Sequence, residues 1–121
     1  MNTGKERILV VDDDDTVRDI VSKMLCRLGY AVLSADSGEK GLALFIKNKF
    51  DLVITDFSMS GMDGIHLAYS IKEKSPATQV VLMTGDDKEV ILSKIKGTAV
   101  AKALFKPFTL TEMDVTCLLY T

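Results

Sequence analysis

Short apolar runs alternate with longer amphipathic stretches five times along the chain. The continuous, β-branched character of these runs is typical of strands buried on both faces, whereas the stretches between them repeat apolar residues at the i, i+3, i+4 spacing of a helix. This alternation predicts an α/β fold, with a doubly wound five-stranded parallel sheet between two helical layers and right-handed crossovers. The expected strands are 7–11, 31–33, 52–55, 79–83 and 99–105.

Capping and turn residues set the expected helix boundaries. A first helix follows from the apolar positions between Val17 and Leu28, with Asp14 or Asp15 as its N-cap and Gly29 as its stop. The remaining helices are expected to begin at Ser37, Asp63, Asp86 and Thr109. The apolar positions assigned to the core on this periodicity include Ile20, Ile46 and Val90.

Composition narrows the class of protein. With 121 residues the chain is expected to form a single domain, 1–121, with a core of about 6–120. A net charge of −2 gives no electrostatic reason to expect nucleic acid or an anionic membrane as a partner. The polar start is not a signal peptide and no apolar run could span a bilayer, so a cytoplasmic location is expected. Cys26 and Cys117 are interpreted as packing residues of a reducing compartment.

Four consecutive acids, Asp12 to Asp15, follow the first strand. They repel one another unless something positive compensates. A helix start explains Asp14 or Asp15, because aspartate favours the N-cap and the first turn. It does not explain Asp12 and Asp13, which lie closest to the strand end. A hard cation such as Mg²⁺ (or Mn²⁺), which prefers carboxylate oxygens, would explain both.

Further polar residues end three of the other strands. Asp56 follows the run 52–55, Thr84 follows 79–83, and Lys106 follows 99–105. Taken singly, the aspartate is equally well a turn cap, the threonine an ordinary strand end and the lysine a solvated charge. However, the carboxyl ends of parallel strands meet at one edge of the sheet, where open α/β sheets place their chemistry. The topology therefore predicts that these side chains converge with the acids of the first strand.

Such a pocket has the parts of a phosphoryl-transfer site, in which positioning and positive charge supply most of the catalysis. Asp56 is the candidate nucleophile that would form an aspartyl-phosphate. The expected metal ligands are Asp12, Asp13, Asp56 and the backbone carbonyl of Ser58. Thr84 would donate a hydrogen bond to a phosphoryl oxygen, and Lys106 would neutralise another. Pro107 fixes the backbone beside this lysine and makes a cis bond possible there.

Four motifs carry these residues: ILVVDDD with Asp12 and Asp13, DLVITDFSMSGMDG with Asp56, LMTG with Thr84, and FKPF with Lys106. In this order the chain resembles, over essentially its whole length, the receiver domain of two-component response regulators. The resemblance implies a CheY-like, flavodoxin-like fold.

The resemblance also implies a function and its partners. A sensor histidine kinase or a histidine phosphotransfer protein would phosphorylate Asp56 in the presence of Mg²⁺. The phosphorylated protein would then change the surface formed by 86–95, 99–105 and the final helix, for an output partner or a phosphorylation-dependent homodimer. It implies no enzyme beyond self-catalysed phosphotransfer and autodephosphorylation.

The chain departs from the family pattern at three places. Ser60 replaces the usual proline of the acceptor loop, and Ala99 replaces the usual glycine before the last strand. Ala103 stands where the family usually has Tyr or Phe, with Phe105 nearby. An alanine cannot act as a rotating aromatic gate, so signalling would rest on Thr84 and the helix of 86–95.

Two positions are candidates for tuning the lifetime of the phosphoryl group. Ser58 and Asp86 each stand two residues after a site residue, near the path of an attacking water, and we expect Asp86 to alter self-dephosphorylation. His66, the only histidine, is expected to be an exposed residue of the third helix.

Two other functions compete with a phosphorylation switch. One is a pseudo-receiver that binds partners without phosphorylation, which Ala103 and Ser60 favour mildly. The other is a phosphatase with an aspartyl-phosphate intermediate, for which Asp13 and Asp15 have the D-x-D spacing while Asp12 and the separate Asp56 fit poorly.

Overall fold

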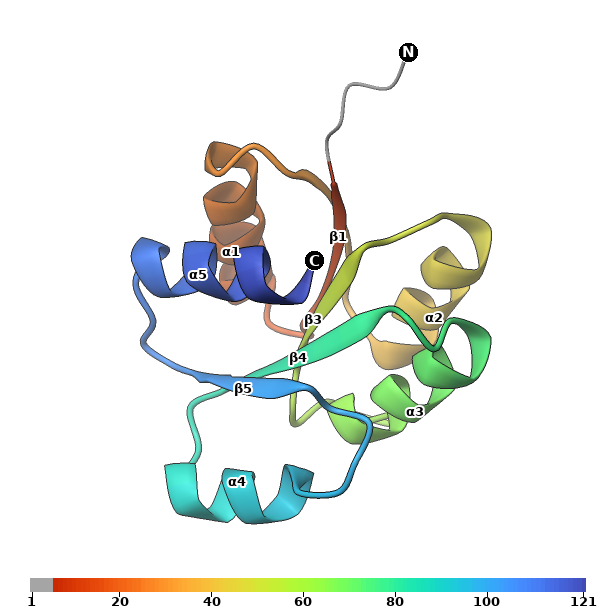
Figure 1. Cartoon of the computed structure of the whole chain (residues 1–121), viewed down its shortest axis with the longest axis vertical. Coiled ribbons are helices and arrows are strands. Elements are labelled where there is room, and N and C mark those ends of the chain that lie inside the picture. Colours follow the sequence, from red (N-terminus) through yellow and green to blue (C-terminus); the bar gives the residue numbers. More distant parts are fainter. Residues whose placement is uncertain (1–5) are drawn as a thin grey trace.

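The structure is a computed structural model that describes residues 6–121. Five strands and five helices alternate along the chain (Figure 1). The strands are β1 (Arg7–Val11), β2 (Ala31–Ala35), β3 (Leu52–Asp56), β4 (Gln79–Thr84) and β5 (Lys102–Phe105). The helices are α1 (Asp15–Arg27), α2 (Gly38–Lys47), α3 (Gly64–Lys74), α4 (Lys88–Ile95) and α5 (Leu110–Tyr120).

All strands are parallel and lie in one sheet in the order β2-β1-β3-β4-β5. Helices α1 and α5 cover one face of the sheet, and α2, α3 and α4 cover the other (Figure 1). The predicted doubly wound fold is therefore confirmed. Because β1 and β3 are neighbours in the middle of the sheet, the chain segments that follow them leave the same edge side by side.

Side-chain alternation along the central strands builds two cores. On β1, Leu9 and Val11 pack toward α2 and α3, whereas Ile8 and Val10 pack toward α1 and α5. All four side chains are fully buried. A strand buried on both faces needs a continuous apolar run, which is why β1, β3 and β4 were recognisable in the sequence.

Three element boundaries differ by two or more residues from those expected, and one of them is the end of β2, which lies at Ala35 rather than at residue 33. β5 begins at Lys102 rather than at residue 99, because pairing with β4 starts only where Lys102 meets Val81. Helix α4 begins at Lys88, with Asp87 as its N-cap; the Asp87 carboxylate accepts hydrogen bonds from the first turn of the helix. Asp86 therefore belongs to the β4–α4 loop rather than to the helix.

Four residues assigned to packing positions are exposed instead. Ile20, Ile46 and Val90 are each exposed by about half or more, because the stripe of each helix that touches the sheet is narrower than its apolar stripe. The prediction was also wrong for Cys26, which is exposed on α1, whereas Cys117 is buried as expected. Within residues 6–121, no helix has both the length and the apolar character needed to cross a membrane.

Both ends of the described chain lie at the amino edge of the sheet. Arg7 opens β1, and its backbone N–H donates to the Asp51 carboxylate just before β3. The last residue, Thr121, borders the same shallow groove as Asp51 and Gln79, which stand at the starts of β3 and β4. The carboxyl edge of the sheet, where the polar strand ends gather, is the opposite one.

Candidate functional site

Asp12 is a buried acid at the carboxyl edge of the sheet and is held there by hydrogen bonds. Its backbone N–H donates to the Ala35 carbonyl (3.1 Å), its Oδ1 accepts from the Asp14 N–H (2.9 Å), and its carbonyl accepts from the Arg18 guanidinium (2.9 Å). The remaining oxygen, Oδ2, is buried and has no hydrogen-bond partner among the described residues. It lies 3.7 Å from the Lys106 ammonium. This one free oxygen therefore faces the other polar strand ends.

Three carboxylates meet at this point. One oxygen each from Asp12, Asp13 and Asp56 lies within 4.8 Å of the other two. Asp12 is buried, Asp56 is half-buried and Asp13 is exposed. An all-oxygen set with one buried, unpartnered oxygen fits a hard cation such as Mg²⁺, which takes carboxylates and retains waters. The predicted convergence of these three acids is thus observed, and they fit the implied metal.

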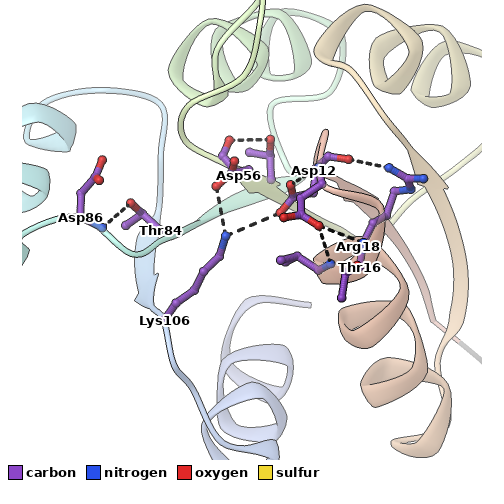
Figure 2. A network of polar contacts seen from close by, with 10 residues as sticks. Asp12, Thr16, Arg18, Asp56, Thr84, Asp86 and Lys106 are labelled. Atoms are coloured by element: carbon purple, nitrogen blue, oxygen red, sulfur yellow. Dashed lines mark hydrogen bonds and ion pairs between the residues drawn. The ribbon is translucent and has the colours of Figure 1, made fainter.

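Lys106 supplies a positive charge from the loop after β5. Its Nζ lies 3.4 Å from Asp56 Oδ1 and 3.7 Å from Asp12 Oδ2, so it bridges the acids of β1 and β3 (Figure 2). Its backbone N–H donates to the Thr84 carbonyl (2.7 Å), and its peptide bond to Pro107 is cis. The ammonium is therefore held against the carboxylates, as predicted, rather than left in solvent.

The surroundings of Asp12 and Asp56 disfavour the charged forms of both carboxyl groups. Burial raises the pKa of Asp12, and the charge of Asp13 adds to this, although a hydrogen bond from Asp14 and the charge of Lys106 oppose it. Burial also raises the pKa of Asp56, the Asp12 charge raises it further, and Lys106 opposes it. Lys106 therefore compensates the negative charge only in part, and a bound cation would compensate the rest.

Thr84 ends β4 at the same edge, but its hydroxyl is turned away from the acids. The hydroxyl oxygen accepts a hydrogen bond from the Asp86 N–H (3.0 Å), and Figure 2 shows this pair apart from the Asp12 side chain. Asp86 itself is exposed. A hydrogen bond from Thr84 to a phosphoryl oxygen, and metal ligation by the exposed Ser58 through its carbonyl, both remain predictions.

The loop between Asp56 and α3 ends at a glycine, Gly64. A Cβ on Gly64 would lie 2.5 Å from the Asp56 carbonyl oxygen and 2.6 Å from Leu82 Cδ1, so only glycine lets α3 start this close to β3. Asp63 caps the helix through the His66 N–H (2.9 Å) and also contacts the His66 ring. His66 is exposed in the first turn, as expected.

Two residues that support the site were not identified from the sequence. Arg18 contacts the Asp12 carbonyl across the first turn of α1, and its i, i+3 spacing to Asp15 was a signal that could have pointed to an ion pair there. Glu39 of α2 accepts a hydrogen bond from the Met62 N–H in the acceptor loop (3.3 Å). This second contact joins residues far apart in sequence, so no local pattern predicts it.

Aromatic side chains lie next to α4, although residue 103 itself is an alanine. Ala103 is buried against the apolar cluster that includes Ile91 of α4. The Lys94 ammonium lies 5.2 Å from the centre of the Phe57 ring, next to Asp56, and the Lys88 ammonium lies 5.9 Å from the centre of the Phe105 ring. Cation–π attraction thus links α4 both to the acceptor loop and to the end of β5.

Comparison with known proteins identifies the family. The model of the response regulator receiver domain matches residues 8–116, nearly the whole chain. The chain belongs to the response regulator receiver domain family. It is similar to the transcriptional regulatory protein ResD of Bacillus subtilis (31% identical over 92% of this chain and 46% of ResD). It is also similar to the autoinducer 1 sensor kinase/phosphatase LuxN of Vibrio campbellii (34% identical over 93% of this chain and 13% of LuxN).

These relatives are longer proteins, and this chain spans less than half the length of either. Solved receiver domains show how closely the fold agrees. The chemotaxis protein CheY4 of Vibrio cholerae superposes with a TM-score of 0.90 at 27% identity, covering 98% of this chain and 100% of CheY4. The response regulator TrrA of Thermotoga maritima, solved with Mg²⁺ and BeF, has a TM-score of 0.86 at 28% identity, covering 96% and 99%. The receiver domain of two-component systems that the motifs suggested is therefore confirmed.

Proposed function

We propose that this receiver domain accepts a phosphoryl group on Asp56, with Mg²⁺ bound by Asp12, Asp13 and Asp56 together with the Ser58 carbonyl. The observation that carries the proposal is the position of the Asp56 carboxylate, between the Lys106 ammonium at 3.4 Å and the two acids of the β1–α1 loop. The solved complex of TrrA with Mg²⁺ and BeF supports a divalent ion in this family.

The chemistry follows from the groups in the pocket. An Asp56 oxygen forms the new bond to phosphorus while the bond between phosphorus and its donor breaks, and the electron pair of that bond leaves with the donor. Lys106 neutralises charge on the equatorial phosphoryl oxygens as a point charge. A bound Mg²⁺ would add charge neutralisation at the same oxygens. Thr84 would have to exchange its hydrogen bond with the Asp86 N–H for one to the phosphoryl group.

The donor would be a sensor histidine kinase or a histidine phosphotransfer protein of the cytoplasm. Similarity to LuxN, a sensor kinase/phosphatase by name, and to ResD, a transcriptional regulatory protein by name, supports partners of these kinds. The output surface would be α4-β5-α5, with Thr84 and the lysine–aromatic contacts of α4 responding in place of an aromatic residue at position 103. The domain would turn over no substrate beyond its own phosphotransfer and autodephosphorylation.

The test is phosphorylation by a small donor. Incubation with MgCl₂ and acetyl phosphate should add the mass of one phosphoryl group, and omission of Mg²⁺ or the substitution Asp56→Asn should abolish the addition. Asp51→Asn is the matched control, because Asp51 is an exposed acid at the opposite edge of the sheet. An intact protein that gains no mass, or gains it equally in Asp56→Asn, would contradict the proposal and favour a phosphorylation-independent binding module.

Asp86 provides a second test. Asp86 is exposed, and its backbone N–H binds the Thr84 hydroxyl at the carboxyl edge of the sheet. Asp86→Ala should change the first-order decay of the phosphorylated domain by a few-fold, which is measured by following the loss of mass after the donor is removed. The N–H that binds Thr84 is kept in this variant, so an unchanged decay rate would show that the carboxylate has no part in the reaction.

A further inference from the structure

Arg18 contacts the backbone of Asp12 but has no role in the proposed phosphoryl transfer itself. It lies on the first turns of α1, but its side chain is only 20% exposed. One guanidinium nitrogen donates to the backbone carbonyl of Asp12 (2.9 Å), as Figure 2 shows. Another donates to the Asp15 carboxylate (2.6 Å). The Asp15 side chain is 85% exposed, and such exposed ion pairs contribute little. The partly buried bond to the Asp12 carbonyl is therefore the more consequential contact.

This carbonyl belongs to the peptide plane that joins Asp12 to Asp13. Its orientation, together with the φ angle of Asp13, sets the direction in which the Asp13 side chain leaves the backbone. No described residue hydrogen-bonds to the Asp13 carboxylate, whereas the Asp12 carboxylate is held by the Asp14 N–H. The placement of Asp13 beside Asp12 and Asp56 thus depends on the backbone of the β1–α1 loop.

The loop also carries the four consecutive acids that require a compensating charge. Lys106 approaches them from the β5 side at 3.7 Å from Asp12. Arg18 approaches from the α1 side, on the side of Asp12 away from Asp56 and Lys106 (Figure 2), and supplies the second positive charge. A planar guanidinium holds the Asp12 carbonyl with a donor fork of fixed geometry, which an ammonium on a flexible stem does less well.

We propose that Arg18 is a positioning residue for divalent-cation binding: by holding the peptide between Asp12 and Asp13, it keeps both carboxylates turned toward the cation. This rests on the proposed function, because it assigns a support to the same metal site. Residues that orient metal ligands typically change metal affinity by about 10–100-fold when they are replaced.

The experiment measures Mg²⁺ affinity of the unphosphorylated full chain by titration calorimetry, with Mn²⁺ and its paramagnetic effect on water relaxation as a second probe. Arg18→Ala and Arg18→Lys should both raise the Mg²⁺ dissociation constant, by about 10-fold for the alanine variant. Free energies of unfolding measured without metal show that each variant is folded. A lysine variant with the affinity of the unmodified protein would mean that charge alone matters, and would overturn the positioning role.

Two control variants separate the contacts. Asp15→Asn removes the charge of the exposed partner of Arg18 but leaves the bond to the Asp12 carbonyl, and Lys23→Ala removes an exposed ion pair with Asp19 on the same helix. Both should keep the Mg²⁺ affinity of the unmodified protein within twofold. An Arg18→Ala variant that loses stability but binds Mg²⁺ normally would overturn this inference alone. An unmodified chain that binds no Mg²⁺ would overturn the metal site of the proposed function as well.

Discussion

At the scale of single residues, Asp12 and Asp56 combine burial with like charge. Each has a raised pKa for the same main reason, removal from water, and each is compensated only in part by Lys106. A carboxyl group placed for packing would be expected to have its oxygens fully hydrogen-bonded. Asp12 instead keeps one buried oxygen without a hydrogen bond among the described residues. The folded protein therefore keeps a destabilising buried carboxylate at the point where a bound cation would stabilise it.

This arrangement predicts that removing the Asp56 charge stabilises the metal-free protein. An aspartate whose pKa is higher in the folded than in the unfolded chain favours folding when protonated. Its contribution is present below the unfolded value of 3.8 and is lost as the pH rises through the folded pKa. Asp56→Asn should therefore raise the free energy of unfolding at pH 7 by about 1 kcal/mol. The advantage should shrink as the pH falls toward 3.8, as urea titrations in EDTA would show; an advantage that grows on acidification would contradict the argument.

At the scale of elements, close approach of α3 to β3 sets the shape of the acceptor loop. Helix α3 starts directly at Gly64, whose backbone N–H donates to the Phe57 carbonyl (3.0 Å). Together with the Asp63 cap, this bond turns the chain into α3 within seven residues after Asp56. The loop therefore has little freedom at its α3 end, and the Asp56 carboxylate projects from a fixed backbone.

Gly64→Ala should destabilise the domain by about 2 kcal/mol, the usual cost of inserting a methyl group into a packed site. The new Cβ would lie 2.5 Å from the backbone oxygen of Asp56, which cannot move aside as a flexible side chain can. Gly85→Ala is the matched control, because nothing lies within 4 Å of its Cβ position; its effect should stay within about 0.5 kcal/mol. Equal unfolding midpoints for the two variants in urea would show that the contact is relieved elsewhere.

The elements also show where sequence reasoning succeeds. Strands β1, β3 and β4 were predictable because burial on both faces demands continuous apolar runs. The caps Asp14, Ser37, Asp63 and Thr109 were predictable because their contacts are local. The site acids were predictable because strand ends of a parallel sheet must meet. By contrast, the start of β5 depends on its pairing with β4, and the contact of Glu39 with Met62 depends on how α2 packs. Neither leaves a local pattern, and the exposure of Ile20 shows that periodicity alone overestimates the buried stripe.

At the scale of the whole molecule, a cation that binds only the folded state should shift the folding equilibrium. The three carboxylates come together only when β1 and β3 are paired, so the unfolded chain has no comparable site. Mg²⁺ at ten times its dissociation constant should then stabilise the protein by about 1.4 kcal/mol. This is measured as a rise in the thermal midpoint that EDTA reverses.

The increment should be lost in Asp13→Asn and kept in Asp19→Asn. Asp13 contributes an oxygen to the carboxylate cluster, whereas Asp19 pairs with Lys23 on the exposed side of α1. A rise of the same size in Asp13→Asn would place the stabilising ion somewhere else on the surface.

The position of the chain ends has a practical consequence. The described chain starts and finishes beside the amino ends of the strands, a full strand length from the carboxylates. A fluorophore, an affinity tag or a tether to a sensor surface joined after Thr121 would stand away from the carboxylates, where a phosphodonor would bind. Kinetic measurements on immobilised or labelled protein should therefore match those on the free chain.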